Sequence, residues 1–261
     1  MLVKDFLSQK EYREREELSA SDIKQLLDNP YKFKIGAKIE ETQAMKLGTL
    51  AHCLVLEPYR FNEIYAVAPE VDKRTKEGKE IWEAFNGANK NKIVIDKAMH
   101  DTAQGIYKSL NDNGLLHAYF TNGKVEVSYL ECELFGVKFK ARPDFISEDG
   151  ELIVDLKCVS DSSPKGFQRI CANLRYYIQA YLYLKITGAK RFVFVAVETK
   201  EPYTIGIYEL DYIALEFAEK EVLRALDILK DIKSQKNIYT LGDLEAKVLT
   251  LPNYVFYDSE A

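Results

Sequence analysis

The chain has 261 residues, with 36 Lys+Arg against 41 Asp+Glu, 47% hydrophobic and 12% aromatic residues. This is an ordinary globular composition that excludes a disordered chain, and the length suits one large domain or two small ones. The longest apolar run, Phe192 to Val197, is far shorter than the roughly 18 residues of a membrane-spanning helix. Residues 1–10 lack the pattern of a secretory signal, so we expect a cytoplasmic protein with no membrane partner.

Charge is unevenly distributed along the chain, whose formal net charge is −5. Residues 156–200 contain eight basic and two acidic residues, whereas residues 201–261 contain twelve acidic and six basic ones. A polyanion would be attracted to the first segment, but solvated helix faces explain the same pattern, and this feature alone favours that simpler explanation. The four cysteines are widely spaced without a C-x-x-C pair, so we expect reduced cysteines and no zinc site.

Helices are predicted throughout the N-terminal part of the chain. Ser19 and Asp22 can accept hydrogen bonds from the first turn of a helix that closes at Asn29-Pro30. Apolar residues at helical spacing then indicate a second helix, which contains His52 and stops before Pro58. These signals predict helices at 19–30, 47–55 and 96–116, and a loop with one helix at 68–91.

The pattern changes after residue 120 to short runs rich in β-branched and aromatic residues, followed by helical spacing. The expected strands are 125–130, 137–146, 151–157, 191–198 and 203–210, and the expected helices are 165–187 and 211–233. This order predicts an α/β (α+β) fold with a central mixed β-sheet that contains an antiparallel meander and is flanked by helices. Glycine-rich nucleotide signatures are absent, so no nucleotide cofactor is expected.

Two acidic residues end neighbouring predicted strands. Asp155 and Lys157 point to one face of their strand while Leu156 points to the other, and a tight hairpin at 147–150 would bring Asp144 close to Asp155. Adjacent carboxylates resist joint ionisation unless a cation neutralises them, and hard oxygen ligands suit Mg²⁺ or Mn²⁺. Lys157 beside that ion would orient or deprotonate a water. An ion pair on a solvent-exposed edge strand is the alternative interpretation.

The ordered set Arg142-Pro143-Asp144 and Asp155-Leu156-Lys157 resembles the P-D…(D/E)-x-K core of the PD-(D/E)XK nuclease superfamily. Gly48 to His52 resembles the G-x-x-x-H element of its RecB-like branch, and Gln179 to Tyr183 resembles the Q-x-x-x-Y element of the same branch. A core histidine and an aromatic packing face are the alternative interpretations of these two elements. Asn29 stands where iron–sulfur members of the branch have a cysteine, so the resemblance implies no iron–sulfur cluster.

The overall arrangement resembles the RecE-type exodeoxyribonucleases (exonuclease VIII), through Leu47 to Pro58, Arg74 to Lys79 and the region of Asp155. This resemblance implies a PD-(D/E)XK nuclease fold and a magnesium-dependent exonuclease that acts on the ends of linear double-stranded DNA. Such an enzyme degrades the 5′-ended strand to a 5′-phosphate product and leaves a 3′ single strand for an annealing or recombinase partner. The resemblance also implies a homo-oligomer in the form of a tetrameric ring.

The resemblance assigns a role to each site residue. It implies a metal held by His52, Asp144, Asp155 and the Leu156 carbonyl. Lys157 would activate the attacking water, and Glu126 would help to bind a second metal or its water, with Glu131 and Glu133 as competing candidates. Gln179 and Tyr183 would position the scissile strand.

Other basic residues are candidates for DNA contacts outside this set. Arg175 lies on the predicted helix of Gln179, where a phosphate could lie. Arg74 and Lys76 lie in the basic segment near Trp82, which either borders the DNA entrance or is a solvated loop. The alternatives to an exonuclease are a structure-specific or restriction-like endonuclease of the same superfamily, a non-catalytic DNA-binding protein with this fold, and a structural interaction module.

The expected organisation is a single nuclease domain, residues 1–261. Within it we expect a mainly helical part with the His motif at 1–120, the catalytic sheet and helices at 121–235, and a tail at 236–261.

Overall fold

The computed structural model describes residues 1–37, 40–234, 248 and 250, so the predicted tail at 236–261 lies outside the described residues except for Val248 and Thr250. The helices are α1 (Gln9–Arg13), α2 (Ala20–Asp28), α3 (Pro30–Lys34), α4 (Gln43–Leu56), α5 (Phe61–Ile64), α6 (Lys76–Ala88), α7 (Lys97–Asp112), α8 (Leu115–Tyr119), α9 (Pro164–Asn173), α10 (Tyr176–Thr187) and α11 (Tyr212–Lys233), with a 3₁₀ turn at Pro58–Arg60. The strands are β1 (Leu2–Lys4), β2 (Tyr65–Val67), β3 (Ile93–Ile95), β4 (Gly123–Val125), β5 (Ser128–Leu134), β6 (Val137–Ala141), β7 (Phe145–Ser147), β8 (Leu152–Val159), β9 (Arg191–Glu198) and β10 (Ile205–Tyr208).

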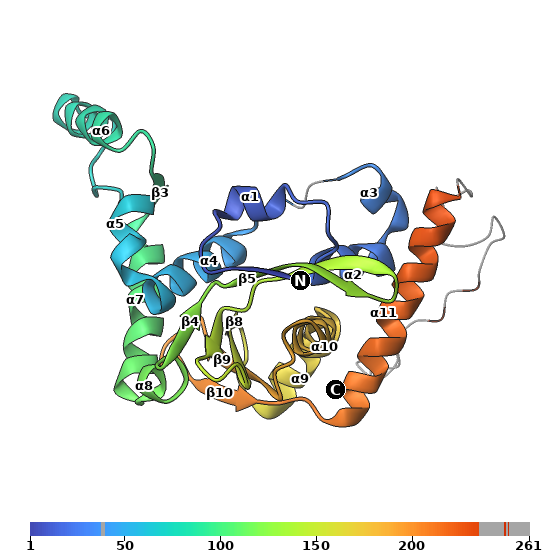
Figure 1. The fold of residues 1–261 in the computed structure, drawn as a ribbon. Helices are drawn as coiled ribbons and strands as arrows, with labels where there is room; N and C mark the ends of the chain where they lie inside the picture. Colours follow the sequence, from blue (N-terminus) through green and yellow to red (C-terminus); the bar gives the residue numbers. More distant parts are fainter. Residues whose placement is uncertain (38–39, 235–247, 249, 251–261) are drawn as a thin grey trace.

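A mixed five-stranded sheet in the order β10-β9-β8-β7-β4 lies at the centre of the fold (Figure 1). Its long inner strands β8 and β9 are parallel over their whole length, whereas the other neighbours are antiparallel. An antiparallel sheet β1-β5-β6 and a parallel pair β2-β3 complete the strands of the described ranges. The predicted mixed sheet with flanking helices is therefore confirmed.

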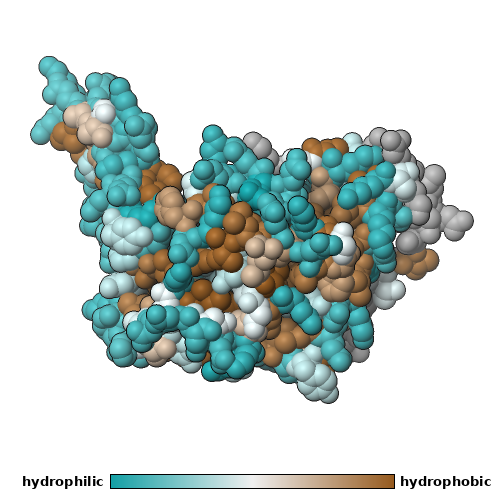
Figure 2. Space-filling view, in the orientation of Figure 1, coloured by the Kyte–Doolittle hydropathy of each residue, from teal (hydrophilic) through white to brown (hydrophobic). Residues whose placement is uncertain are grey.

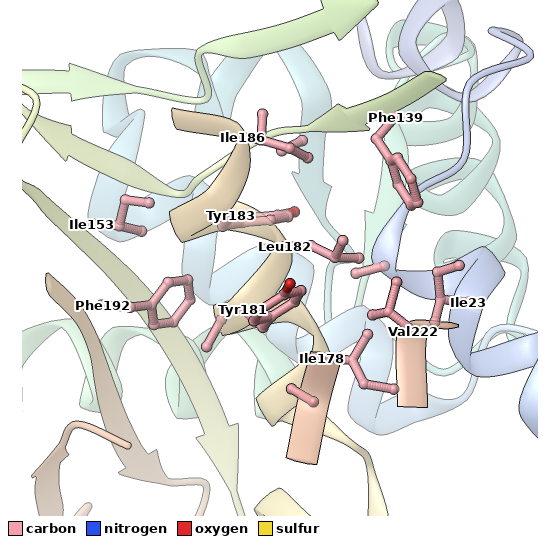
Figure 3. Close-up of a cluster of buried hydrophobic side chains, with 14 of the residues drawn as sticks. Ile23, Phe139, Ile153, Ile178, Tyr181, Leu182, Tyr183, Ile186, Phe192 and Val222 are labelled. Atoms are coloured by element: carbon pink, nitrogen blue, oxygen red, sulfur yellow. The ribbon is translucent and has the colours of Figure 1, made fainter. Parts of the chain in front are cut away.

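Two apolar layers cover the two faces of this sheet. On one face, α10 packs with α2, α11 and the β5-β6 strands around Ile153, Phe192 and Phe194. Figure 3 shows α10 side chains between Ile153 and Phe192 on one side and Ile23 and Val222 on the other. On the opposite face, α4 and α7 cover residues that point the other way, such as Val154 and Leu156 on β8. Alternation along β8 thus directs successive side chains into different layers.

Two of the elements predicted after residue 130 are each divided in the structure. The strand expected at 137–146 is interrupted at Arg142 to Asp144, and its halves β6 and β7 belong to different sheets. Pro143 has no N–H for a sheet ladder, which explains the break. The helix expected at 165–187 is interrupted before Arg175, whose left-handed backbone (φ +48°) separates α9 from α10. The predicted meander is therefore shared between two sheets.

The helix α6, within the segment expected to be a loop with one helix, projects from the body of the molecule (Figure 1). Of its residues only Gly78 is buried, and Figure 2 shows a mostly hydrophilic surface on this projection. Hereafter, residues 68–92 are called the α6 arm. None of the helices in the described ranges is both long enough and apolar enough to cross a bilayer.

Candidate active site

The β8 residues Asp155 and Lys157 form a closed network with α10. Asp155 is fully buried, and its Oδ2 accepts a 2.7 Å hydrogen bond from Gln179 Nε2. Its Oδ1 forms an ion pair with Lys157 Nζ, which also donates to Gln179 Oε1 at 3.2 Å. Lys157 Nζ lies 4.8 Å from the centre of the Tyr176 ring. Hereafter, Asp155, Lys157 and Gln179 are called the lysine cluster.

Charge within the lysine cluster is internally balanced. Burial by itself lowers the pKa of Lys157, but the negative charges of Asp155 and Asp144 outweigh it, so the pKa is raised above the ordinary lysine value. Lys157 is therefore an ammonium at neutral pH. Gln179 bridges both charged partners, since its amide nitrogen donates to the carboxylate and its oxygen accepts from the ammonium.

A second group lies beside this network and consists of His52, Glu126 and Asp144, hereafter the acidic cluster. One ligand atom from each of the three residues lies within 4.8 Å of the others. His52 Nδ1 is 3.4 Å from Asp144 Oδ2, and His52 Nε2 is 2.8 Å from the Leu156 carbonyl oxygen. Asp144 Oδ2 also accepts a 2.8 Å hydrogen bond from the backbone N–H of Leu156. The backbone of β8 thus connects the two clusters.

Local structure explains how each member of the acidic cluster reaches this point. On α4, Gly48 and His52 are one helical turn apart on the face that meets the cavity, whereas Leu50 and Ala51 are buried. Glu126 lies between β4 and β5 with a left-handed backbone (φ +54°), which is strained for a residue with a side chain. Its N–H donates to the Asp144 carbonyl oxygen at 3.1 Å.

Electrostatics in the acidic cluster are unbalanced. Burial, together with the charge of Asp144, raises the pKa of Glu126 to about 8. Burial also raises the pKa of Asp144 to about 6, although His52 acts in the opposite direction. The cation nearest to Glu126 is Arg142, whose Nε is 4.0 Å away and donates instead to Ser128 Oγ at 2.9 Å.

These groups fit a divalent cation. Both nitrogens of His52 face oxygen acceptors, the Leu156 carbonyl and the Asp144 carboxylate, and a neutral ring can donate a hydrogen to one of them only. The other nitrogen then presents a lone pair toward an acceptor, which is unfavourable unless a proton or a cation lies between them. One imidazole and two carboxylates are ligands that Mg²⁺ and Mn²⁺ accept.

A cavity of about 820 Å³ opens above these groups. Its lining includes the acidic cluster together with Gln179 and Tyr183 from α10, and the N-terminal segment 5–24 forms a further wall. Two buried cations hold that wall through its backbone. Lys140 Nζ donates to the carbonyl oxygens of Tyr12 and Arg15 at 2.9 and 2.7 Å, and Arg142 Nη2 donates to that of Leu7 at 3.0 Å.

The structure brings most of the predicted site residues together. Tyr183 is buried one helical turn after Gln179, and burial raises its pKa well above the ordinary tyrosine value, with contributions from the charges of Asp155 and Asp144. Of the competing acidic candidates, Glu131 lies 3.5 Å from Arg15 and Glu133 is exposed, so Glu126 is the one that joins the cluster.

Three predicted DNA-binding residues lie elsewhere. Arg175 forms an ion pair with Asp28 and lines a separate hollow beside α11. On the α6 arm, Arg74 Nε is 3.1 Å from Asp72 Oδ1 and Lys76 Nζ is 4.0 Å from Glu80 Oε1, and the side chains of both basic residues are almost completely exposed. A role in DNA binding for these three residues stays a prediction.

Sequence reasoning missed the contributions of the N-terminal segment and α2. Lys24 on α2 and Tyr12 on α1 both line the cavity. Lys24 follows the buried Ile23 directly, and a lysine at the edge of an apolar helical stripe is the signal that was available. Tyr12 offered no comparable signal, because its place over Arg142, 4.2 Å from its ring centre, depends on contacts between distant segments.

Comparison with known proteins identifies the family. The PDDEXK-like domain of unknown function (DUF3799) matches residues 19–239. The chain belongs to this family. No curated protein sequence matches it. The family match covers every residue of both clusters and agrees with the PD-(D/E)XK arrangement of β7, β8 and α10 around them.

Several solved structures are similar to this chain. A protein from Eubacterium rectale, named as a candidate exonuclease, is 19% identical with a TM-score of 0.64, and the match covers 98% of each chain. A phage-related exonuclease from Haemophilus somnus is 16% identical with a TM-score of 0.39, covering 86% of this chain and 98% of that one. An alkaline exonuclease from Laribacter hongkongensis is 14% identical with a TM-score of 0.35, covering 84% and 90%. The first of these matches supports the PD-(D/E)XK nuclease fold.

Proposed function

We propose that this DUF3799 protein is a metal-dependent exodeoxyribonuclease that hydrolyses the 5′-ended strand of linear double-stranded DNA. The observation that carries the proposal is the proximity of the two clusters: Asp155 and Lys157 lie on β8, and Asp144 of the acidic cluster accepts a hydrogen bond from the backbone N–H of Leu156 between them. Paired carboxylates, an imidazole and an adjacent ammonium are the groups that metal-assisted phosphodiester hydrolysis requires. The membership of a PDDEXK-like family supports the same chemistry.

Each cluster has a separate task in this proposal. His52, Glu126 and Asp144 would hold the divalent ion, and the Leu156 carbonyl and Asp155 border that position from β8. When bound, Mg²⁺ lowers the pKa of a coordinated water and offsets charge that develops on the phosphate. Lys157 orients the attacking water through its ammonium hydrogens. Its raised pKa disfavours a role in which neutral Lys157 removes the proton.

Gln179 positions Lys157 and Asp155, since its amide oxygen accepts a hydrogen bond from Lys157 and its amide nitrogen donates one to Asp155. This assignment differs from direct contact with the scissile strand, which the sequence resemblance implies. Tyr183, on the same face of α10 and in the lining of the cavity, stays the candidate for contact with the strand. The exposed Arg74 and Lys76 on the α6 arm would contact duplex phosphates without reading sequence.

The wider process is proposed from the resemblance to RecE-type enzymes. A 3′ single strand would remain for an annealing partner, and the active form would be a homo-oligomer, a tetrameric ring in that resemblance. An endonuclease with the same clusters is the second candidate, because the acidic and lysine clusters serve hydrolysis at an internal phosphodiester equally well.

End-labelled linear duplex DNA and covalently closed plasmid provide the decisive test. With Mg²⁺, we expect the linear DNA to be degraded to 5′-phosphorylated products from its 5′ ends while the closed plasmid survives, and we expect no degradation with EDTA. Asp144→Asn should abolish the reaction, whereas Glu133→Gln, which changes an exposed acid on β5, should not. Rapid nicking of the plasmid would favour the endonuclease. Unchanged cleavage by Asp144→Asn would contradict the proposed site.

A further inference from the structure

Three lysines are largely buried near the cavity, and their partners differ. Lys140 donates to two backbone carbonyl oxygens, and Lys157 is paired with Asp155 and bonded to Gln179. Lys24, on α2, makes no hydrogen bond and no ion pair with any residue in the described part of the chain. Its ammonium lies 5.1 Å from the centre of the Tyr176 ring, the same ring that Lys157 approaches from 4.8 Å. Lys24 is therefore a partly buried ammonium without a hydrogen-bonded or ion-paired partner in the described part of the chain.

The two carboxylates on α2 near Lys24 are bonded to other residues and do not pair with it. Asp22, two residues before Lys24 on α2, accepts hydrogen bonds from the backbone N–H and the hydroxyl of Ser19 at 2.7 and 2.6 Å. Asp28, at the end of the same helix, is paired with Arg175. Burial lowers the pKa of Lys24 to about 8, and the positive charge of Lys157 acts in the same direction, whereas the charge of Asp155 partly opposes it. An added anion would stabilise the charged form.

Lys24 also has access to the substrate side of the site. It lines the same cavity as His52, Asp144 and Gln179, so its ammonium can meet a ligand that enters there. Lys24 and Lys157 both approach the Tyr176 ring, but Lys157 is already paired with Asp155, whereas Lys24 is not. An anion on this wall would therefore contact Lys24 without displacing the lysine cluster.

We infer that Lys24 and the adjacent α2 wall form a phosphate-binding subsite for the strand held in the cavity. The inference rests on the proposed function for the nature of the ligand, which is a phosphate group of a nucleic acid. That group is either an internal phosphodiester or the terminal phosphate of the strand. An ammonium without a carboxylate partner suits such a ligand, because hydrogen bonds between charged groups are stronger than those between neutral groups.

Binding of short duplex DNA in Ca²⁺, followed by fluorescence anisotropy, tests the subsite without turnover. Lys24→Met should weaken binding by about 10- to 100-fold, the range for loss of one hydrogen bond between charged groups. Lys24→Arg should retain most of the affinity. Lys220→Met, which changes an exposed lysine on α11, is the matched control and should bind as the wild type does.

The phosphate source is resolved by two versions of the duplex, one with 5′-phosphate and one with 5′-hydroxyl ends. A Lys24→Met defect confined to the phosphorylated duplex identifies a terminal phosphate, and an equal defect for both identifies an internal one. Wild-type affinity of a folded Lys24→Met protein for both duplexes would overturn the subsite.

Lysine labelling on the unaltered protein covers the case in which Lys24→Met does not fold. We expect the duplex to slow reductive methylation of Lys24, measured by mass spectrometry, several-fold more than that of Lys220, and equal rates with and without DNA would also overturn the subsite. Because neither assay needs cleavage, a wild-type protein that binds DNA through Lys24 but does not hydrolyse it with Mg²⁺ would refute the nuclease proposal alone. Normal cleavage by the wild type combined with wild-type binding by Lys24→Met would refute the subsite alone.

Discussion

The acidic cluster and the lysine cluster both meet strand β8 but differ in how their charges are compensated. Asp155 is fully buried yet has an ammonium and an amide as partners, so its cluster is complete within the protein. Asp144 lies 3.4 Å from His52 and Glu126 lies 4.0 Å from Arg142, but the pKa values of both carboxyl groups are still raised. The difference indicates that the lysine cluster is charge-balanced within the protein, whereas the acidic cluster would be balanced by the divalent ion of the proposed function.

Removing Lys157 should have the largest effect, because Lys157 is the cation that pairs with the buried Asp155 in the lysine cluster. We expect Lys157→Ala to reduce cleavage by about 10²- to 10³-fold, the usual cost of losing one preorganised hydrogen-bond donor at the reacting centre. It also leaves Asp155 buried without its cation, so thermal or urea unfolding should show a loss of about 3–5 kcal/mol in the free energy of unfolding.

A double variant separates these two effects. Asp155→Asn with Lys157→Met removes both charges, so it should recover most of the stability while remaining inactive. Equal stability of Lys157→Ala and the wild type would contradict the view that the two residues form one charge-balanced pair.

The acidic cluster should make stability depend on pH in the direction opposite to that of ordinary acidic ion pairs. The folded pKa values of about 6 for Asp144 and about 8 for Glu126 lie above the ordinary carboxyl range. The folded protein therefore binds more protons than the unfolded chain between about pH 4 and 8, and metal-free stability falls as the pH rises through this window. Melting temperatures measured with EDTA should decrease accordingly.

Glu126→Gln and Mg²⁺ test the cause of this decrease. Glu126→Gln should reduce the decrease of the melting temperature between about pH 6 and 8, and Glu133→Gln should leave this decrease unchanged. Mg²⁺ at about 100 times its Kd should stabilise the wild type by about 2.7 kcal/mol, and the effect should shrink in Glu126→Gln. A melting temperature in EDTA that does not change with pH would contradict the idea that the carboxylates of the acidic cluster lack charge compensation.

The smallest effect is expected from the α6 arm, which lies outside both clusters. Arg74→Ala with Lys76→Ala should lower DNA affinity by less than about tenfold at low salt, since two exposed phosphate contacts act through counterion release. The difference from the wild type should decrease as salt is added, and the rate at saturating DNA should not change. A loss of rate at saturating DNA would instead mean that the α6 arm takes part in catalysis together with the two clusters.

The sequence predicted the members of both clusters better than their connections. Alternation along β8 correctly separates Leu156 from Asp155 and Lys157, and helical spacing correctly places Gln179 and Tyr183 on one face of α10. These are periodic properties of single elements. The hydrogen bonds of Gln179 with Asp155 and Lys157, and the grouping of Glu126 with Asp144, depend on how the elements pack against one another. The periodicity of a single element carries no information about that packing.

Breaks inside elements were harder to predict for a related reason. The apolar pattern continues across Pro143 and across Arg175, so each segment was interpreted as one element. Pro143 is a local signal for the first break, whereas the left-handed backbone at Arg175 accompanies a tertiary contact, the ion pair of this residue with Asp28. The predicted roles of Arg175 in DNA binding and of residues 236–261 as a tail stay predictions.

The hydrogen bond between His52 and the Leu156 carbonyl has a consequence for biosynthesis. It joins two parts of the chain that are 104 residues apart, and Gln179 completes the arrangement only later in the sequence. During translation, a polypeptide that has emerged from the ribosome only as far as α8 contains His52 but neither Asp144 nor Lys157. The site of the proposed hydrolysis therefore needs a chain that extends at least to Gln179, and products of interrupted synthesis that end before this residue would lack part of it.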